Sequence, residues 1–93
     1  MAIDFKPYAA VNDHWGDKMP LMACEEMAEL IKAISKFERH YDDEYNPKEE
    51  YQRQDIITEM ADVWISCCAL ANRYNISEAE VGEAIWKKMD RRY

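Results

Sequence analysis

The stretch DIITEMADVWISCCALANRY, residues 55–74, decides the fold of this chain. When it is drawn as a helix at about 100° per residue, apolar side chains cover most of the circumference. Neither glycine nor proline interrupts it. A helix that is apolar on nearly all sides is normally buried among other helices. The sequence therefore predicts an all-α helical bundle with this helix at its centre.

Helix signals on either side define two more principal helices. Asn46 and Pro47 supply an N-cap and a first-turn proline, so the central helix is expected to begin there. From about Pro20 to His40 the chain is rich in strong helix formers, which predicts an earlier helix. The capping-box pattern from Ser77 to Glu80 opens a last helix that reaches at least Met89.

Residues 1–19 contain Pro7 and Gly16 and show no sustained hydrophobic period. We expect an irregular N-terminal arm there, with one helical turn near residues 8–12. At 93 residues the chain has the length of one domain, so residues 1–93 are expected to form a single unit.

The composition excludes several classes of protein. Two glycines and three prolines are too few turn formers for a β-sandwich or barrel, and no apolar run approaches the ~20 residues of a membrane span. The formal charge of −7 disfavours nucleic-acid polymers and anionic membrane surfaces as partners. Three cysteines without a CxxC pair, and an N-terminal stretch without a signal-peptide pattern, favour a cytoplasmic location.

Carboxylates occupy unexpected positions on the first two principal helices. Glu26 lies about 60° around its helix from Glu29, on a flank where a simple amphipathic helix carries apolar residues. Glu59 and Asp62 form the polar strip of the otherwise apolar central helix. The residues close to the same angular range are Asp55, Ser66 and Arg73. The solvated stripe expected on the first helix consists of Glu25, Glu29, Lys32, Lys36 and Arg39.

The two acidic motifs meet if these helices form an antiparallel hairpin. A loop centred near Glu44 pairs Glu29 with Glu59 and Glu26 with Asp62. Four carboxylates held so close repel one another unless they are protonated or bind cations. Oxygen donors select a hard ion such as Mg²⁺ or Mn²⁺. Each motif alone is ordinary helix surface, and only their combination in register predicts a metal-binding hairpin.

The motifs EEMAEL (residues 25–30) and EMADVWI (residues 59–65) resemble those of the MazG-like nucleoside triphosphate pyrophosphohydrolases. The likeness extends over about residues 14–93. It implies a Mg²⁺-dependent enzyme that hydrolyses an NTP or dNTP to the monophosphate and pyrophosphate. The positions that match the family's metal ligands are Glu26, Glu29, Glu59 and Asp62. The resemblance makes Glu29, or its neighbour Glu25, the candidate catalytic base.

Other residues are expected to contact the nucleotide. Lys88 and Arg91 match the family's basic positions and are candidates for phosphate binding, although cations also stabilise a helix C-terminus. His14, Trp15 and Trp64 offer flat side chains on which a nucleobase can stack. Aromatic residues at helical spacing are more often part of a core.

A chain of this length buries too little surface to cover the central helix alone. We therefore expect a homodimer or homotetramer that completes four-helix bundles, and the site can then borrow Trp15 or the C-terminal basic residues from a second subunit. Two alternatives stay open. One is a phosphoribosyl-ATP pyrophosphatase-like hydrolase, although the glycine-bearing stretch before its first motif is not evident here. The other is a non-catalytic helical oligomer or partner-binding module of the same fold.

Overall fold

The computed structural model describes residues 4–39 and 49–92, and every regular element in these ranges is helical. In chain order the elements are η1 (Lys6–Tyr8), α1 (Ala9–Trp15), η2 (Gly16–Lys18), α2 (Met19–Arg39), α3 (Glu49–Arg73) and α4 (Glu78–Arg92). The predicted all-α fold with three principal helices is confirmed by α2, α3 and α4. The predicted start of the central helix at Asn46 and Pro47 lies outside the described residues.

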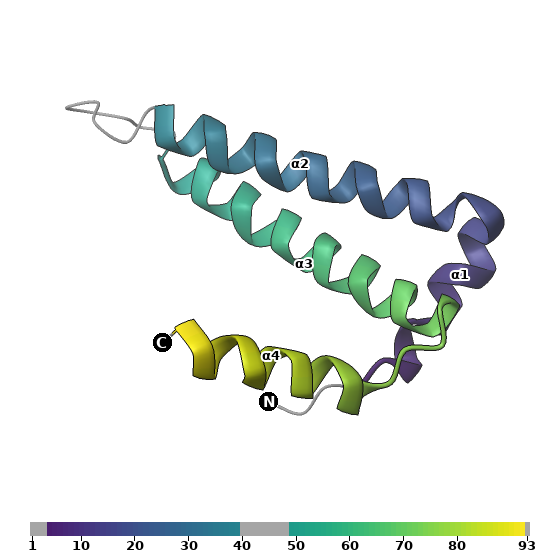
Figure 1. The fold of residues 1–93 in the computed structure, drawn as a ribbon. Coiled ribbons are helices and arrows are strands. Elements are labelled where there is room, and N and C mark those ends of the chain that lie inside the picture. The colour runs from purple at the N-terminus through teal and green to yellow at the C-terminus, as the bar shows by residue number, and fades with distance from the viewer. Residues whose placement is uncertain (1–3, 40–48, 93) are drawn as a thin grey trace.

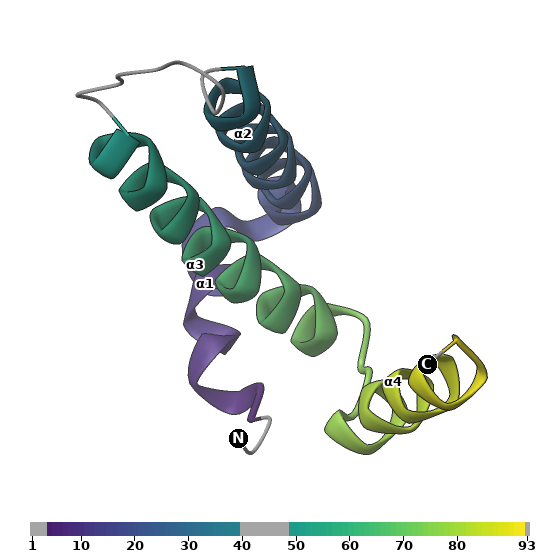
Figure 2. The ribbon, with the colours of Figure 1, turned by 90° about the vertical axis from the view of Figure 1, so that its left-hand side faces the viewer.

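Helices α2 and α3 run antiparallel beside each other (Figure 1), as the hairpin prediction requires. Helix α1 and the two 3-10 turns lie across the end of this pair where α2 begins and α3 ends. Figure 2 shows α4 turned away from the hairpin, so it does not form a third layer against α2.

The N-terminal arm is more regular than predicted, because residues 6–18 form α1 between two 3-10 turns. Gly16 ends α1 and is the first residue of η2, with φ of +57°, a conformation that residues with a Cβ rarely adopt. A helix of seven residues is not stable alone. It is held by α3, since the Asn12 side-chain amide donates a hydrogen bond of 2.7 Å to the carbonyl of Ala69.

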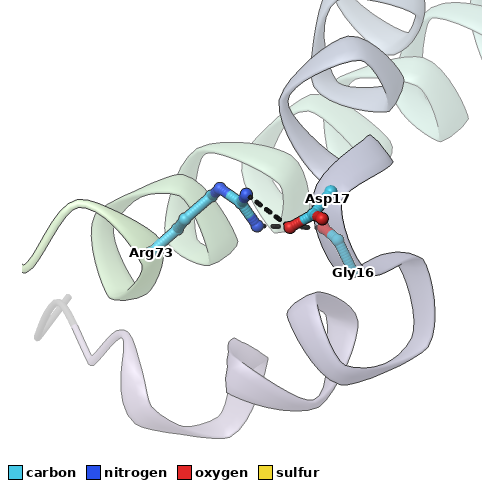
Figure 3. A network of polar contacts seen from close by, with 3 residues as sticks. All are labelled: Gly16, Asp17 and Arg73. Carbon is cyan, nitrogen blue, oxygen red and sulfur yellow. Dashed lines mark hydrogen bonds and ion pairs between the residues drawn. The ribbon is translucent and has the colours of Figure 1, made fainter.

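Polar contacts from the end of α3 also hold the arm in place. Arg73 Nη1 donates to the carbonyl of Gly16 at 2.9 Å, and Nη2 lies 3.4 Å from Asp17 Oδ1 (Figure 3). The Asn72 side-chain amide donates to the carbonyl of Phe5. Because these bonds join residues far apart in sequence, they fix where the arm lies against the hairpin.

The core is small and lies where the arm meets the hairpin. Met19 and Ala23 of α2 pack with Ala69 of α3, while Phe5 packs with Cys68 and Ala71. Each of these six residues is at most 5% exposed. Partly buried apolar side chains of the arm pack against both groups, so the arm is part of the core.

A left-handed residue ends α3 and sets the direction of α4. Asn75 has φ of +55°, and the amide of Ile76 donates to the carbonyl of Ala71 at 2.8 Å, the pattern of a Schellman cap. The predicted cap of the last helix is confirmed, because the hydroxyl oxygen of Ser77 accepts a hydrogen bond of 3.1 Å from the amide of Glu80.

The single chain is open. Its radius of gyration is 16.1 Å, whereas a compact domain of this length has about 12 Å. The central helix is consequently not covered on all sides, and Met60 and Trp64 of α3 are 57% and 41% exposed. Helix α4 also presents Trp86 and Met89 to solvent. None of the described helices is both long enough and apolar enough to cross a membrane.

Candidate metal centre

Three carboxylates from α2 and α3 converge halfway along the hairpin. One side-chain oxygen from each of Glu26, Glu59 and Asp62 can be chosen so that all three lie within 4.8 Å of one another, and all three residues are partly buried. Glu26 comes from α2, while Glu59 and Asp62 lie on successive turns of α3. The structure thus brings together three of the four carboxylates that the hairpin register paired, and leaves Glu29 outside this set.

Desolvation and neighbouring charges disfavour the ionised forms of Glu26 and Glu59. Partial burial raises the pKa of Glu26 above its ordinary value, and the charges of Asp62 and Glu59 and a hydrogen bond with Asp62 raise it further. The pKa of Glu59 is raised by desolvation first and then by the charges of Asp62, Glu29 and Asp55. Unlike an ordinary surface pair, this cluster gains from any cation that enters it.

The other two predicted acidic residues are placed differently from each other. Glu29 is exposed, and its oxygens do not belong to the set of three, but its charge raises the pKa of both Glu26 and Glu59. Glu25 is exposed and lines neither of the hollows beside the cluster. Position therefore favours Glu29 over Glu25 as the residue that acts with the cluster.

The donor set fits a hard divalent cation. All three converging groups are carboxylates, without a cysteine or histidine in the set, and such oxygen ligands suit Mg²⁺ or Mn²⁺. Glu26, Glu59 and Asp62 would hold the ion, with Glu29 beside them. Desolvation and the neighbouring carboxylates raise the pKa values of Glu26 and Glu59, and a bound cation would offset both effects by favouring the ionised carboxylates.

A cavity of about 190 Å³ opens on one side of the cluster. We call it the aromatic cavity, and it is lined by Val11, Trp15, Met19, Met22, Glu26, Asp62, Ile65 and Ser66. Trp15 is 40% exposed, and its ring meets that of His14 edge to face at 4.9 Å between centroids. One side of the cavity is therefore apolar and includes the partly exposed Trp15, and the other side includes two carboxylates of the cluster, Glu26 and Asp62.

A second hollow of about 250 Å³ opens on the other side of the cluster, toward the far end of the hairpin. We call it the lysine hollow, and it is lined by Glu29, Lys32, Ala33, Lys36, Asp55 and Glu59. Sequence reasoning assigned Lys32 and Lys36 to a solvated stripe and missed this hollow. The available signal was their spacing of three and seven residues after Glu29, which places both lysines on the same face of α2 as Glu29.

The remaining predicted site residues lie away from the cluster in a single chain. Trp64 lines an apolar groove of about 300 Å³ between α3 and α4, which we call the α3–α4 groove. Its lining residues are Phe5, Trp64, Cys67, Leu70, Ala71, Tyr74, Ile76, Val81 and Ile85. Lys88 and Arg91 line a separate hollow on α4 with Lys87, Glu80 and Glu83. Contact of Trp64, Lys88 or Arg91 with a ligand of the cluster stays a prediction.

Comparison with known families supports the same interpretation. The model of the MazG nucleotide pyrophosphohydrolase domain matches residues 17–93, which include α2, α3, α4 and all the carboxylates described above. Searches of curated proteins and of solved structures returned no match. Since the family model covers most of the chain, this protein belongs to the MazG nucleotide pyrophosphohydrolase domain family.

Proposed function

We propose that this protein is a Mg²⁺-dependent enzyme of the cytoplasmic nucleotide pool that hydrolyses an NTP or dNTP to the monophosphate and pyrophosphate. The observation that carries the proposal is the cluster of Glu26, Glu59 and Asp62, with oxygens within 4.8 Å, beside a cavity walled by Trp15. An aromatic surface can stack on a nucleotide's base and a carboxylate cluster can hold the cation that binds its phosphates, and Trp15 and this cluster adjoin one cavity here. Mn²⁺ is the expected substitute ion.

The reaction is a displacement at phosphorus. Attack of a water oxygen on the α-phosphorus forms one P–O bond and breaks the bond to the bridging oxygen. That oxygen keeps the electron pair and leaves with pyrophosphate, while the water proton passes to a carboxylate and then to solvent. A divalent ion bound at the cluster supplies Lewis-acid chemistry, since it polarises phosphate oxygens and makes water more acidic.

The chain's own side chains have separate roles in this proposal. Glu29 accepts the proton, because it adjoins the cluster but lies outside the tight set of three. Glu25 is the alternative base. Trp15 stacks on the base, and the edge-to-face contact with His14 orients the Trp15 ring. The apolar wall of the aromatic cavity excludes water from the base, as in most small-molecule sites.

A second copy of the chain completes the site in this proposal. Both α3 and α4 carry exposed apolar residues, among them Met60, Trp64, Ile85 and Met89. Burying them in a homodimer or homotetramer would form the predicted four-helix bundles. Helix α4 of one copy would then be free to bring Lys88 and Arg91 to another copy's phosphates. Sedimentation of a single 11 kDa species at micromolar concentration would contradict this arrangement.

A panel of canonical and modified NTPs and dNTPs, assayed for pyrophosphate release with Mg²⁺ and with a chelator, tests the function. We expect release from at least one nucleotide only with the metal. Glu59→Gln should reduce the rate at least about a hundredfold, the scale of losing one stabilising group at the reacting centre. Glu38→Gln is the matched control, since Glu38 is exposed on α2 outside both hollows. Metal-independent release, or full activity of Glu59→Gln, would refute the proposal.

A further inference from the structure

We propose that the lysine hollow is the subsite for the leaving pyrophosphate, with Lys32 and Lys36 as its binding groups. This inference rests on the proposed function and adds to it the direction in which the substrate lies. The hollow is lined by two cationic side chains from α2 and by Glu29, Asp55 and Glu59. It therefore combines cations with carboxylates that adjoin the metal cluster.

The order of features along the hairpin supports this assignment. The aromatic cavity contacts the cluster through Glu26 and Asp62, whereas the lysine hollow contacts it through Glu59. The cluster thus lies between an apolar, aromatic hollow and a charged one. A nucleoside triphosphate has the same order of chemistry, with an aromatic base at one end, the α-phosphate next, and the β- and γ-phosphates at the other end.

The spacing along α2 fits the same direction. At about 1.5 Å of rise per residue, Lys32 lies about 5 Å and Lys36 about 10 Å beyond Glu29 along the helix axis. A substrate with its base against Trp15 and its α-phosphate at the cluster extends its β- and γ-phosphates toward these two side chains. The released pyrophosphate then stays in contact with both ammonium groups until it dissociates.

The two lysines are available for a ligand. Among the described residues the side-chain ion pairs are Arg73 with Asp17 and Lys87 with Glu83, and Lys32 and Lys36 form none, although they share a hollow with three carboxylates. Both are exposed on α2. An anion that enters the hollow consequently displaces water from these ammonium groups and does not have to break an existing ion pair.

A competing explanation is that the lysines only reduce the repulsion within the acidic cluster. The two roles differ in the measurement that they affect. Removing a nearby positive charge makes the cluster more negative and strengthens its affinity for Mg²⁺. Weaker pyrophosphate binding at saturating Mg²⁺ therefore cannot arise from loss of the metal. A general change in the field of the site would weaken monophosphate binding as well, so a loss restricted to pyrophosphate reports on direct contact.

The test is calorimetric titration of inorganic pyrophosphate at saturating Mg²⁺ into the full chain. We expect Lys32→Gln and Lys36→Gln each to weaken binding by about threefold to tenfold, the scale of an exposed charge-assisted contact. Lys32→Arg and Lys36→Arg should bind nearly as the unsubstituted protein does. Arg39→Gln is the matched control, because Arg39 is an exposed cation of α2 outside the hollow. Its affinity should stay within about twofold.

Titration of AMP and CMP separates this subsite from the rest of the site, since the Gln variants should bind a monophosphate unchanged. The proposal is overturned if the Lys32→Gln/Lys36→Gln double variant binds pyrophosphate normally, if it loses monophosphate affinity equally, or if the unsubstituted protein binds no pyrophosphate. Loss confined to Lys88→Gln and Arg91→Gln also overturns it. Absence of pyrophosphate release from any nucleotide, with these titrations as expected, would instead refute the proposed function alone.

Discussion

Replacing Glu26 by glutamine should stabilise the metal-free protein and abolish its response to Mg²⁺. Glu26 lies with Asp62 and Glu59 in a set of oxygens within 4.8 Å. Two unit charges at this distance repel by about 1 kcal/mol in a water-like medium. Because these residues are partly exposed, solvent and salt screen the two pairs, and we take about 1 kcal/mol as the total gain. Glutamine keeps the shape of the side chain and removes the charge.

The expected changes are large enough to measure by thermal unfolding. A gain of about 1 kcal/mol raises the melting temperature by about 4–8 °C for a domain of this size. For the unsubstituted protein, Mg²⁺ at about 100 times its Kd stabilises by about 2.7 kcal/mol, which corresponds to a rise of about 10–20 °C. Glu26→Gln should lose most of that rise, so its curves with and without Mg²⁺ should nearly coincide.

Circular dichroism melts with saturating MgCl₂, and with NaCl at equal ionic strength, separate metal binding from screening. Glu38→Gln removes the same charge from an exposed position of α2 and should keep the full Mg²⁺ response. If Glu26→Gln melts at a lower temperature than the unsubstituted metal-free protein, repulsion among the three carboxylates does not destabilise the fold. If it retains the whole Mg²⁺ response, Glu26 is not a ligand.

Three further outcomes are expected. The folded protein binds protons at Glu26 and Glu59 more tightly than the unfolded chain does, because both pKa values are raised above the ordinary value of 4.5. The unfolding free energy of the metal-free protein, measured in urea, should therefore fall as pH rises above about 4.5 through the raised pKa values. A rise over that pH range would contradict the convergence of the carboxylates. Trp15→Leu should increase KM about tenfold with little change in kcat, the scale of one stacked base, and a loss confined to kcat would argue against stacking. Met19 is 1% exposed and packs with Ala23 and Ala69, so Met19→Ala should lower the unfolding free energy by about 2–5 kcal/mol, seen as a lower urea midpoint at unchanged slope. A neutral result would show that α2 and α3 do not pack through Met19.

Much of the carboxylate site was predictable from sequence, because helix periodicity and the position of the connecting loop together fix which residues of the two helices face each other. Antiparallel helices with a known loop centre have nearly determined register, so the pairing of Glu26 with Asp62 followed from residue numbers alone. The difference between Glu25 and Glu29 did not follow. It depends on how far each side chain extends toward α3, which is a matter of contact across the hairpin.

The arm and the aromatic residues show where sequence reasoning ended. Residues 6–18 lack a sustained hydrophobic period, yet they form helical turns because Asn12 and Gly16 contact Ala69 and Arg73 of α3. Such partners lie more than fifty residues away, as their positions show. Trp15 and Trp64 were both candidates for stacking in the sequence, and only the placement of the arm and of α4 assigned them to different hollows.

The sequence by itself determined the all-α class, the approximate extents of the three principal helices within the described residues, and the register that brings two acidic motifs together. These properties depend on hydrogen bonds and side-chain periods within a few residues of each position. Only the tertiary structure decided that a short N-terminal helix completes the core, that an aromatic cavity and a lysine hollow flank the carboxylates, and that α4 stands apart from them. Those features depend on contacts between residues distant in sequence, whose geometry no local pattern encodes.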